Sequence, residues 1–139
     1  KDDKEKKYFH SELKKMCNIH NKKYYPKYKK WCDKYFYINH RKEPRGIGGI
    51  FFDYKMDNWE KDFSFVKDVG NFFIYISKKI IRKKMFKKWT KIEKEMQLLK
   101  RGRYVEFNLM YDRGTKFGLN SGGNTEAILM SMPPSAKWK

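Results

Sequence analysis

The amino-acid sequence predicts an α+β fold, in which helices flank a mostly antiparallel sheet. Apolar residues recur at helical spacing in the first third of the chain. Residues 103–111 instead alternate between apolar and polar side chains, as in a strand with one buried face. Two apolar runs, at 47–53 and 126–132, predict two further strands. Three strands are too few to cover four or five helices, so the predicted sheet is incomplete within these 139 residues.

The first two predicted helices are amphipathic. Residues 8–19 place four apolar side chains at helical spacing, namely Phe9, Leu13, Met16 and Cys17. After a turn at 18–23, Pro26 suits the first turn of a second helix. That helix has a wide apolar face made of Tyr28, Trp31, Cys32, Tyr35 and Phe36. Because neither cysteine belongs to a Cys-x-x-Cys pair, both are predicted to be buried, reduced thiols.

Glycine and proline interrupt the chain after the second helix. Pro44 and Gly46 break helicity within 39–46, and 47–53 is predicted to form a buried strand. Gly48 and Gly49 weaken a strand unless another group approaches the backbone closely. Three interpretations remain open: a β-bulge, a helix packed tightly against the sheet, or a ligand ring lying on the glycines.

A capping box at Asp57-x-x-Glu60 predicts the start of the next helix. Its inward side chains are predicted to be Trp59, Phe63 and Val66. Gly70 is expected to end or bend this helix, and a separate helix is expected at 72–84.

A second capping box, Thr90-Lys-Ile-Glu93, predicts another helix that Gly102 stops. Its inward side chains are predicted to be Ile92, Met96 and Leu99. The alternating strand at 103–111 follows, with Glu106 and Asn108 on its polar face. A turn at 120–124 then leads to the last predicted strand, at 126–132, which Pro133 and Pro134 terminate.

The formal net charge is +18, because 34 lysines and arginines face 16 aspartates and glutamates. Such a charge attracts anions at long range. The lysines occur singly and in pairs along the whole chain instead of forming one stripe, which favours a solvated basic surface over a nucleic-acid-binding face or a funnel for a small polycarboxylate. No apolar run reaches the roughly 20 residues of a membrane span. The charged start without an initiator methionine predicts that the natural N-terminus lies upstream, and no targeting segment is expected in the chain.

Two segments resemble signatures of the oxygen-dependent coproporphyrinogen III oxidases. One is the glycine-containing block at 31–53, WCDKYFYINHRKEPRGIGGIFFD, and the other is RGRYVEFNLMYDRGTKFGL at 101–119. The resemblance extends from about Phe9 to Trp138, and it implies that residues 1–139 are the C-terminal part of a single domain of this family. It also implies that an upstream half carries a histidine proton donor.

The resemblance implies oxidative decarboxylation of coproporphyrinogen III to protoporphyrinogen IX, with dioxygen as co-substrate and no organic cofactor. It further implies a homodimer that uses the region from Val105 onward, a cytoplasmic or organellar location, and no nucleic-acid partner. Two other classes of function stay open from the residues alone. One is a basic module that binds nucleic acid through lysines and stacked aromatics, and the other is a catalytically inactive dimerisation fragment.

The resemblance implies that Asp112 holds pyrrole N–H groups and that Arg113 anchors a propionate. A carboxylate accepts several hydrogen bonds, and a guanidinium fork suits a carboxylate. From the residues alone, adjacent aspartate and arginine side chains more often point apart and cap or pair with other groups. Substrate contacts are also implied for the loop residues Gly123, Asn124 and Thr125. Asn124 stands where family members often have arginine, and Tyr54 stands where they have a second aspartate.

Further candidates flank the glycine pair. Arg41 and Arg45 are predicted to bind a ligand that lies on Gly48 and Gly49, with an ion pair to Glu43 or a helix cap as the alternative. The resemblance implies His10 and His40 as candidate ligands of a divalent metal, against structural or substrate-side roles. The third histidine, His20, is predicted to be solvated in a turn.

Overall fold

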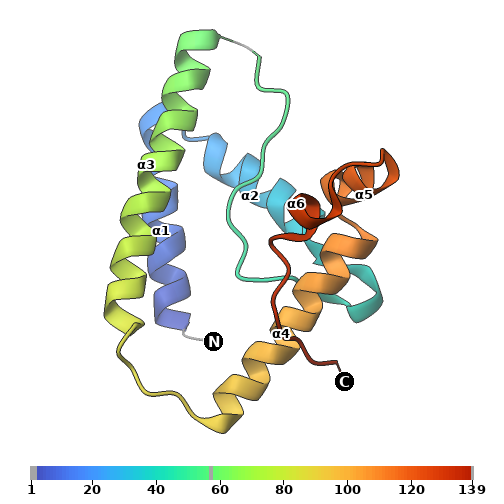
Figure 1. Ribbon diagram of the computed structural model, residues 1–139. Helices are drawn as coiled ribbons and strands as arrows, with labels where there is room; N and C mark the ends of the chain where they lie inside the picture. The colour runs from blue at the N-terminus through green and yellow to red at the C-terminus, as the bar shows by residue number, and fades with distance from the viewer. Residues whose placement is uncertain (1–2, 57, 139) are drawn as a thin grey trace. The chain divides into compact units, whose positions relative to one another are not determined.

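A computed structural model describes residues 3–56 and 58–138, and its fold is mostly helical (Figure 1). Contacts between residues divide the chain into two compact units. One takes in the described residues of Lys1–Tyr35 and Gly46–Lys87, and the other takes in those of Phe36–Arg45 and Lys88–Lys139. The predicted mostly antiparallel sheet is not confirmed, because the described residues form one sheet of two very short strands. The elements in chain order are α1 (Asp3–His20), α2 (Tyr24–Tyr35), β1 (Tyr37–Ile38), the 3-10 helix η1 (Asn39–Arg41), β2 (Glu43–Pro44), α3 (Trp59–Lys84), α4 (Lys91–Met110), α5 (Arg113–Asn120) and α6 (Thr125–Leu129).

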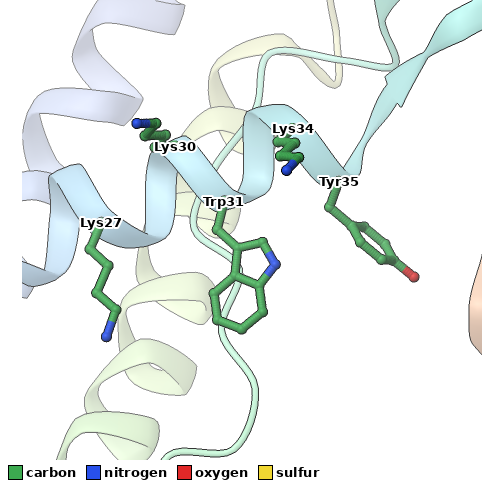
Figure 2. Close-up of a pocket in the computed structure, with 5 residues that line it drawn as sticks. All are labelled: Lys27, Lys30, Trp31, Lys34 and Tyr35. Carbon is green, nitrogen blue, oxygen red and sulfur yellow. The ribbon is translucent and has the colours of Figure 1, made fainter.

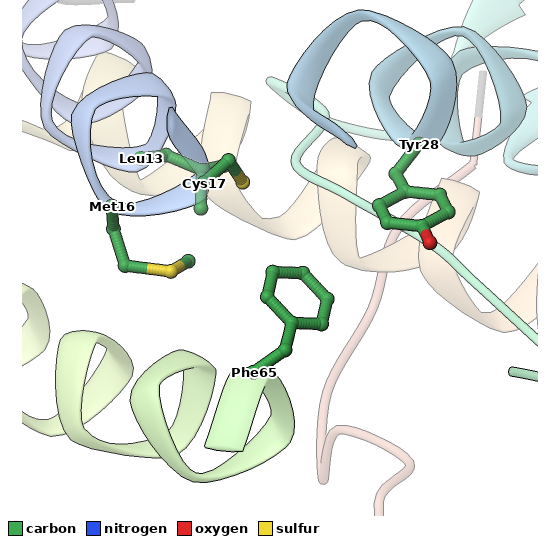
Figure 3. Packing of buried hydrophobic residues seen from close by; sticks show 5 residues of the cluster. All are labelled: Leu13, Met16, Cys17, Tyr28 and Phe65. Atoms are coloured by element: carbon green, nitrogen blue, oxygen red, sulfur yellow. The ribbon is translucent and has the colours of Figure 1, made fainter. Parts of the chain in front are cut away.

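The core of the first unit confirms the two predicted amphipathic helices. Helix α1 packs against both α2 and α3. The buried cluster takes its side chains from these three helices, as Figure 3 shows: Leu13, Met16, Cys17, Tyr28 and Phe65. Fully burying one large apolar side chain stabilises a fold by about 1.5–3 kcal/mol, so this cluster is a main source of the unit's stability. The predicted burial of both cysteines is also confirmed, since Cys17 and Cys32 are both buried.

The predicted strand at 47–53 is wrong, because this segment has no regular secondary structure. A strand requires a neighbouring strand to bond its backbone, and here the Phe51 N–H donates to the carbonyl of Tyr28 in α2, at 3.1 Å. The segment lies against helix α2 instead. Because no sheet forms at 47–53, a β-bulge or a helix packed on a sheet does not occur there as predicted. Helix α2 nevertheless lies close to Gly48, whose φ is +79° and where an added Cβ would lie 2.9 Å from Asp33 Oδ1. An added Cβ at Gly49 would have no heavy atom of a described residue within 4 Å.

Helix α3 is one continuous helix where the sequence predicted two. Gly70 lies in its interior and neither ends nor interrupts it. The N-cap is Asn58, whose side chain accepts from the Lys61 N–H, whereas the predicted cap Asp57 lies outside the described residues. The predicted inward face is wrong, because Trp59, Phe63 and Val66 are all exposed.

A different face of α3 is buried. It contains Phe65, Ile76 and Asp62. The Asp62 carboxylate is paired with the Lys55 ammonium, which also lies over the Tyr24 ring. A buried carboxylate is tolerated only when it is paired and hydrogen-bonded, and this pair meets that requirement.

Helix α4 extends through residues that the sequence assigned to a stop and a strand. The predicted capping box is confirmed, with Thr90 and Glu93 bonded reciprocally. Gly102 lies inside the helix and does not end it. A Cβ added at this position would clash with the Lys137 carbonyl oxygen, so glycine allows the C-terminal segment to pack closely against α4. The Lys137 N–H donates to the Leu98 carbonyl at 3.1 Å. Of the side chains predicted inward, Ile92 and Met96 are exposed.

The predicted strand at 103–111 is therefore wrong, since 103–110 belongs to α4. Its residues satisfy helical as well as alternating spacing: Arg103, Glu106, Phe107 and Met110 follow i, i+3, i+4 and i+7. A helix satisfies its backbone donors within itself, and in the described part of the chain the two strands pair with each other and not with this segment. Phe107 is fully buried as a result.

Two short helices, α5 and α6, follow α4 in the second unit. The predicted turn before Asn124 is confirmed, but the predicted strand at 126–132 is wrong, because 125–129 forms α6. Ile128 packs against Gly118 of α5, where an added Cβ would lie 2.9 Å from the isoleucine Cδ1. Among the described residues, no helix combines the length and apolar character that a membrane span requires.

Candidate functional site

The Asp112–Arg113 pair lies where the chain leaves α4 and enters α5. Asp112 is the N-cap of α5, and its Oδ2 accepts from the Thr115 N–H at 2.8 Å and from Thr115 Oγ1 at 3.0 Å. Arg113 is the exposed first residue of the helix. Asp112 thus caps α5, which is the role that the residues alone favoured.

The loop at 122–125 has the same construction at the start of α6. Asn124 is the N-cap, and its Oδ1 accepts from the Ala127 N–H at 3.2 Å. Gly123 donates its N–H to the Gly118 carbonyl at 3.1 Å, and an added Cβ there would lie 3.0 Å from that oxygen. Gly123, Asn124 and Thr125 are all exposed. The predicted substrate loop is therefore a capped, solvent-facing turn.

Arg41 is held by Glu106, while Glu43 also interacts with it electrostatically. Its Nε donates to Glu106 Oε2 at 3.0 Å and its Nη2 donates to Oε1 at 2.6 Å. This two-pronged geometry is the strongest arrangement of a guanidinium and a carboxylate. Glu43 instead accepts from Lys100 and from Arg103, each at 2.9 Å.

Arg45 lies over aromatic rings. Its guanidinium carbon is 4.2 Å from the Phe36 ring centroid, 5.0 Å from that of Phe107 and 5.3 Å from that of Tyr104. Cation–π contacts of this kind contribute about 0.5–2 kcal/mol. Arg41 and Arg45 therefore both attach the segment 36–45 to α4.

His40 completes a polar cluster centred on Glu106. One imidazole nitrogen, Nε2, is 2.9 Å from Glu106 Oε2, and the other, Nδ1, is 2.8 Å from the Tyr111 hydroxyl. The hydrogen bond from Arg41 lowers the pKa of Glu106 to about 2, assisted by His40 and the charge of Arg103. Because Tyr111 directly precedes Asp112, the cluster anchors the residue before the predicted catalytic carboxylate.

Sequence reasoning did not find this cluster. A strand places Arg103 and Glu106 on opposite faces, whereas a helix brings i and i+3 together. The Arg103-x-x-Glu106 spacing was the available signal, since such pairs support a helix. The contacts of Glu106 with Arg41 and His40 span 65 and 66 residues, and no local pattern indicates them.

The other two histidines lie in the first unit. His10 has Nε2 at 2.8 Å from the Ile47 carbonyl and Nδ1 at 3.1 Å from the Tyr25 hydroxyl. The prediction of a solvated His20 is wrong, because its side chain is 14% exposed and lies 2.7 Å from Asp68.

Both nitrogens of His10 and of His40 face protein groups. Within residues 3–56 and 58–138, no three His, Cys, Asp or Glu side chains form a group that could hold a metal. The described side chains alone therefore supply no complete ligand set for a metal. Metal ligation by His10 and His40 stays a prediction.

The two signature segments can now be placed on the fold. The block at 31–53 covers the end of α2, the two-stranded sheet and the segment that carries the glycine pair, and 101–119 covers the end of α4 and most of α5. These elements hold every site candidate except His10 and the loop at 123–125. The comparison with known families agrees with this placement, since residues 1–139 match the family described as Coproporphyrinogen III oxidase. The chain belongs to that family.

Individual relatives are close to the chain in sequence. A protein of Rickettsia bellii (strain OSU 85-389), named Oxygen-dependent coproporphyrinogen-III oxidase, is 59% identical over 131 residues. Proteins of the same name from Rickettsia akari (strain Hartford) and Rickettsia rickettsii (strain Sheila Smith) are 58% and 57% identical. Each match covers 94% of this chain and 47% of the relative. The chain therefore spans about half the length of the curated relatives it matches.

Proposed function

We propose that this chain is part of an oxygen-dependent coproporphyrinogen III oxidase. The observation that carries the proposal is the 59% identity to a protein of that name over 94% of the chain. In the proposed reaction, two propionate side chains of coproporphyrinogen III become vinyl groups. Each propionate loses carbon dioxide and a hydride, that is, one proton and two electrons. Dioxygen accepts the hydride together with one further proton and becomes hydrogen peroxide. Dioxygen is the co-substrate, and no organic cofactor takes part.

The proposed role of Asp112 is to accept hydrogen bonds from the pyrrole N–H groups of the substrate. A carboxylate suits this role because its oxygens can accept several hydrogen bonds at once. Polarising an N–H raises electron density on the pyrrole, which favours its reaction with dioxygen. Arg113, exposed on the next position, is proposed to bind one propionate through its guanidinium fork.

The remaining candidates are proposed as secondary substrate contacts. The turn at 123–125 offers backbone groups and the Asn124 amide in place of the arginine common in the family. Gly48 and Gly49 are proposed to let a ring approach the backbone. Arg41 and Arg45 are proposed to act mainly through positive charge, since Glu106 already holds the fork of Arg41.

The experiment uses the complete gene product that contains this chain. Coproporphyrinogen III is loaded without oxygen, oxygen is admitted, and vinyl products are separated by chromatography. Asp112→Asn removes the charge but keeps an N-cap of equal quality. We expect it to lower kcat by roughly 100-fold or more, in the range found for positioned proton-handling groups.

The control variant is Thr115→Ala, which deletes the 3.0 Å hydroxyl contact to Asp112 but keeps the carboxylate. It should keep most of the activity. Unchanged activity in Asp112→Asn, which keeps the cap, would mean that Asp112 acts only as a cap. No product from the correctly folded wild-type protein would refute the oxidase proposal itself.

A homodimer is the proposed assembly. Its support is a set of exposed apolar side chains in the region from Val105 onward: Leu109, Met110, Phe117, Met130 and Trp138. Exposed apolar residues in such number are typical of an interface. Phe117→Glu together with Met130→Glu should convert a dimer to a monomer in sedimentation analysis, and an unchanged dimer would place the interface elsewhere. A cytoplasmic location is also proposed, and cell fractionation tests it.

A further inference from the structure

Helix α2 carries a pocket that belongs to none of the predicted site residues. Its volume is about 460 Å³, within the roughly 300–1,000 Å³ of small-molecule sites. All lining residues come from this helix and lie within the first unit: Lys27, Lys30, Trp31, Lys34 and Tyr35. They follow i, i+3, i+4, i+7 and i+8, so one face of the helix presents two rings among three ammonium groups.

The two rings of the pocket are held in place by a third. The Phe51 ring packs edge-on against Trp31, with centroids 5.5 Å apart and planes at 85°. It also stacks on Tyr35, with centroids 4.5 Å apart and planes at 13°. Figure 2 shows Lys27, Trp31 and Tyr35 extending to one side of α2, with Lys30 and Lys34 along the helix above them. Rings fixed before binding lose little side-chain entropy when a ligand arrives.

All the charged side chains that line the pocket are positive. Its lining holds three lysines and no acidic residue. Within the part of the chain that the structure describes, none of these lysines is paired with a carboxylate, whereas Lys29 on the same helix is paired with Asp33 at 2.6 Å. Lysine ammonium groups are donors only. The lining thus has no carboxylate, thiol or imidazole for a cation, and its donors suit a ligand with several negative groups.

We propose that this pocket binds a small planar aromatic anion that carries two or more carboxylate or phosphate groups. The aromatic ring of such a ligand can stack on the indole of Trp31, and the lysines can bind its negative groups. Nucleotides and aromatic polycarboxylates share this chemistry. The proposal does not rest on the oxidase reaction, and it is tested without turnover.

The test is isothermal titration calorimetry of the complete gene product with three probes. Pyromellitate has four carboxylates on a benzene ring, butanetetracarboxylate has four on an aliphatic chain, and ATP has a nucleobase and a triphosphate. We expect pyromellitate, ATP or both to bind at least about tenfold more tightly than butanetetracarboxylate, since stacking on an aromatic side chain contributes about that much. The tighter aromatic probe identifies the source of the ligand. Equal binding of all three probes would overturn the proposal.

Two variants and a charge-matched control locate the binding. Trp31→Leu should remove the preference for the aromatic probes, and the double variant Lys30→Gln, Lys34→Gln should weaken their binding by about tenfold or more. The control is Lys22→Gln with Lys23→Gln, which removes the same charge from two exposed lysines outside the pocket. Equal weakening by the two lysine pairs would overturn the proposal, because the +18 charge of the chain would then be the whole cause. The lysine pair also keeps the test decisive if Trp31→Leu fails to fold.

Discussion

Replacing Glu106 by glutamine should destabilise the protein strongly at neutral pH and weakly in acid. Glutamine keeps the shape of the side chain but removes the charge that faces Arg41, His40 and Arg103. The side chain is 10% exposed, so solvent screens these contacts little. Breaking a largely buried pair leaves the remaining cation without compensation, which is the costly case.

The magnitude follows from the pKa of Glu106, which falls from the usual 4.5 to about 2. Each pH unit corresponds to about 1.4 kcal/mol, so ionisation of Glu106 stabilises the folded state by about 3 kcal/mol at neutral pH. Because the folded-state pKa is the lower one, this stability is fully present above about pH 4.5. It is lost as the pH falls from there towards 2.

The assay is urea denaturation of wild type and Glu106→Gln from pH 7 down to pH 3. The difference in unfolding free energy should be about 3 kcal/mol at pH 7 and should shrink steadily below about pH 4.5. Glu95→Gln is the control on the same helix, since its partner Lys137 is 51% exposed and such pairs contribute at most about 1 kcal/mol. A difference below 1 kcal/mol, or one that does not change with pH, would refute the cluster's stabilising role.

Other substitutions test the packing. Gly102→Ala should lower the unfolding free energy by about 1–3 kcal/mol, because the new Cβ would clash with the Lys137 carbonyl. Gly70→Ala should raise it by about 0.5–1 kcal/mol, because no heavy atom of a described residue lies within 4 Å of the new Cβ. Equal effects of the two substitutions in urea denaturation would contradict this contrast. Phe65→Ala should cost about 3–5 kcal/mol, and a loss below 1 kcal/mol would exclude Phe65 from the core. Burial raises the pKa of Cys17 to about 11, so iodoacetamide at pH 8 should label it far more slowly than the unfolded chain, as mass spectrometry can measure.

Helix prediction succeeded where caps and spacing agreed. The Thr90–Glu93 box and the apolar spacing from Phe9 to Cys17 are local features, and the structure has both. Gly70 and Gly102 were taken as helix ends, although glycine inside a helix costs only about 1 kcal/mol. Packing of α3 against α1 outweighs that cost at Gly70, and a close backbone contact requires the glycine at Gly102.

Strand prediction failed because a strand depends on partners that the sequence pattern does not reveal. The alternation at 103–111 is compatible with a helix as well as with a strand. Which of the two forms depends on the elements that pack beside the segment. The same dependence explains α3, which has apolar residues on several sides. The side that is buried is the one that packs against α1. Local spacing could not show that Phe65 lies inside while Phe63 is 54% exposed.

The site candidates were predictable as residues but not as contacts. The signature segments indicated Asp112 and Arg41 directly. The cap on Thr115 and the Glu106 cluster depend on helix starts and on pairs 65 residues apart, which appear only in three dimensions.

The division of the chain between the two units constrains its synthesis. Residues 36–45 belong with α4, but the chain of the first unit continues on both sides of them. Arg41 leaves the ribosome 65 residues before its partner Glu106. At about 5–20 residues per second, this segment waits roughly 3–13 s while the helices around it emerge and can already pack. The first unit can therefore begin to fold before residues 36–45 have their partners, and these residues can pack against α4 only after α4 has been translated.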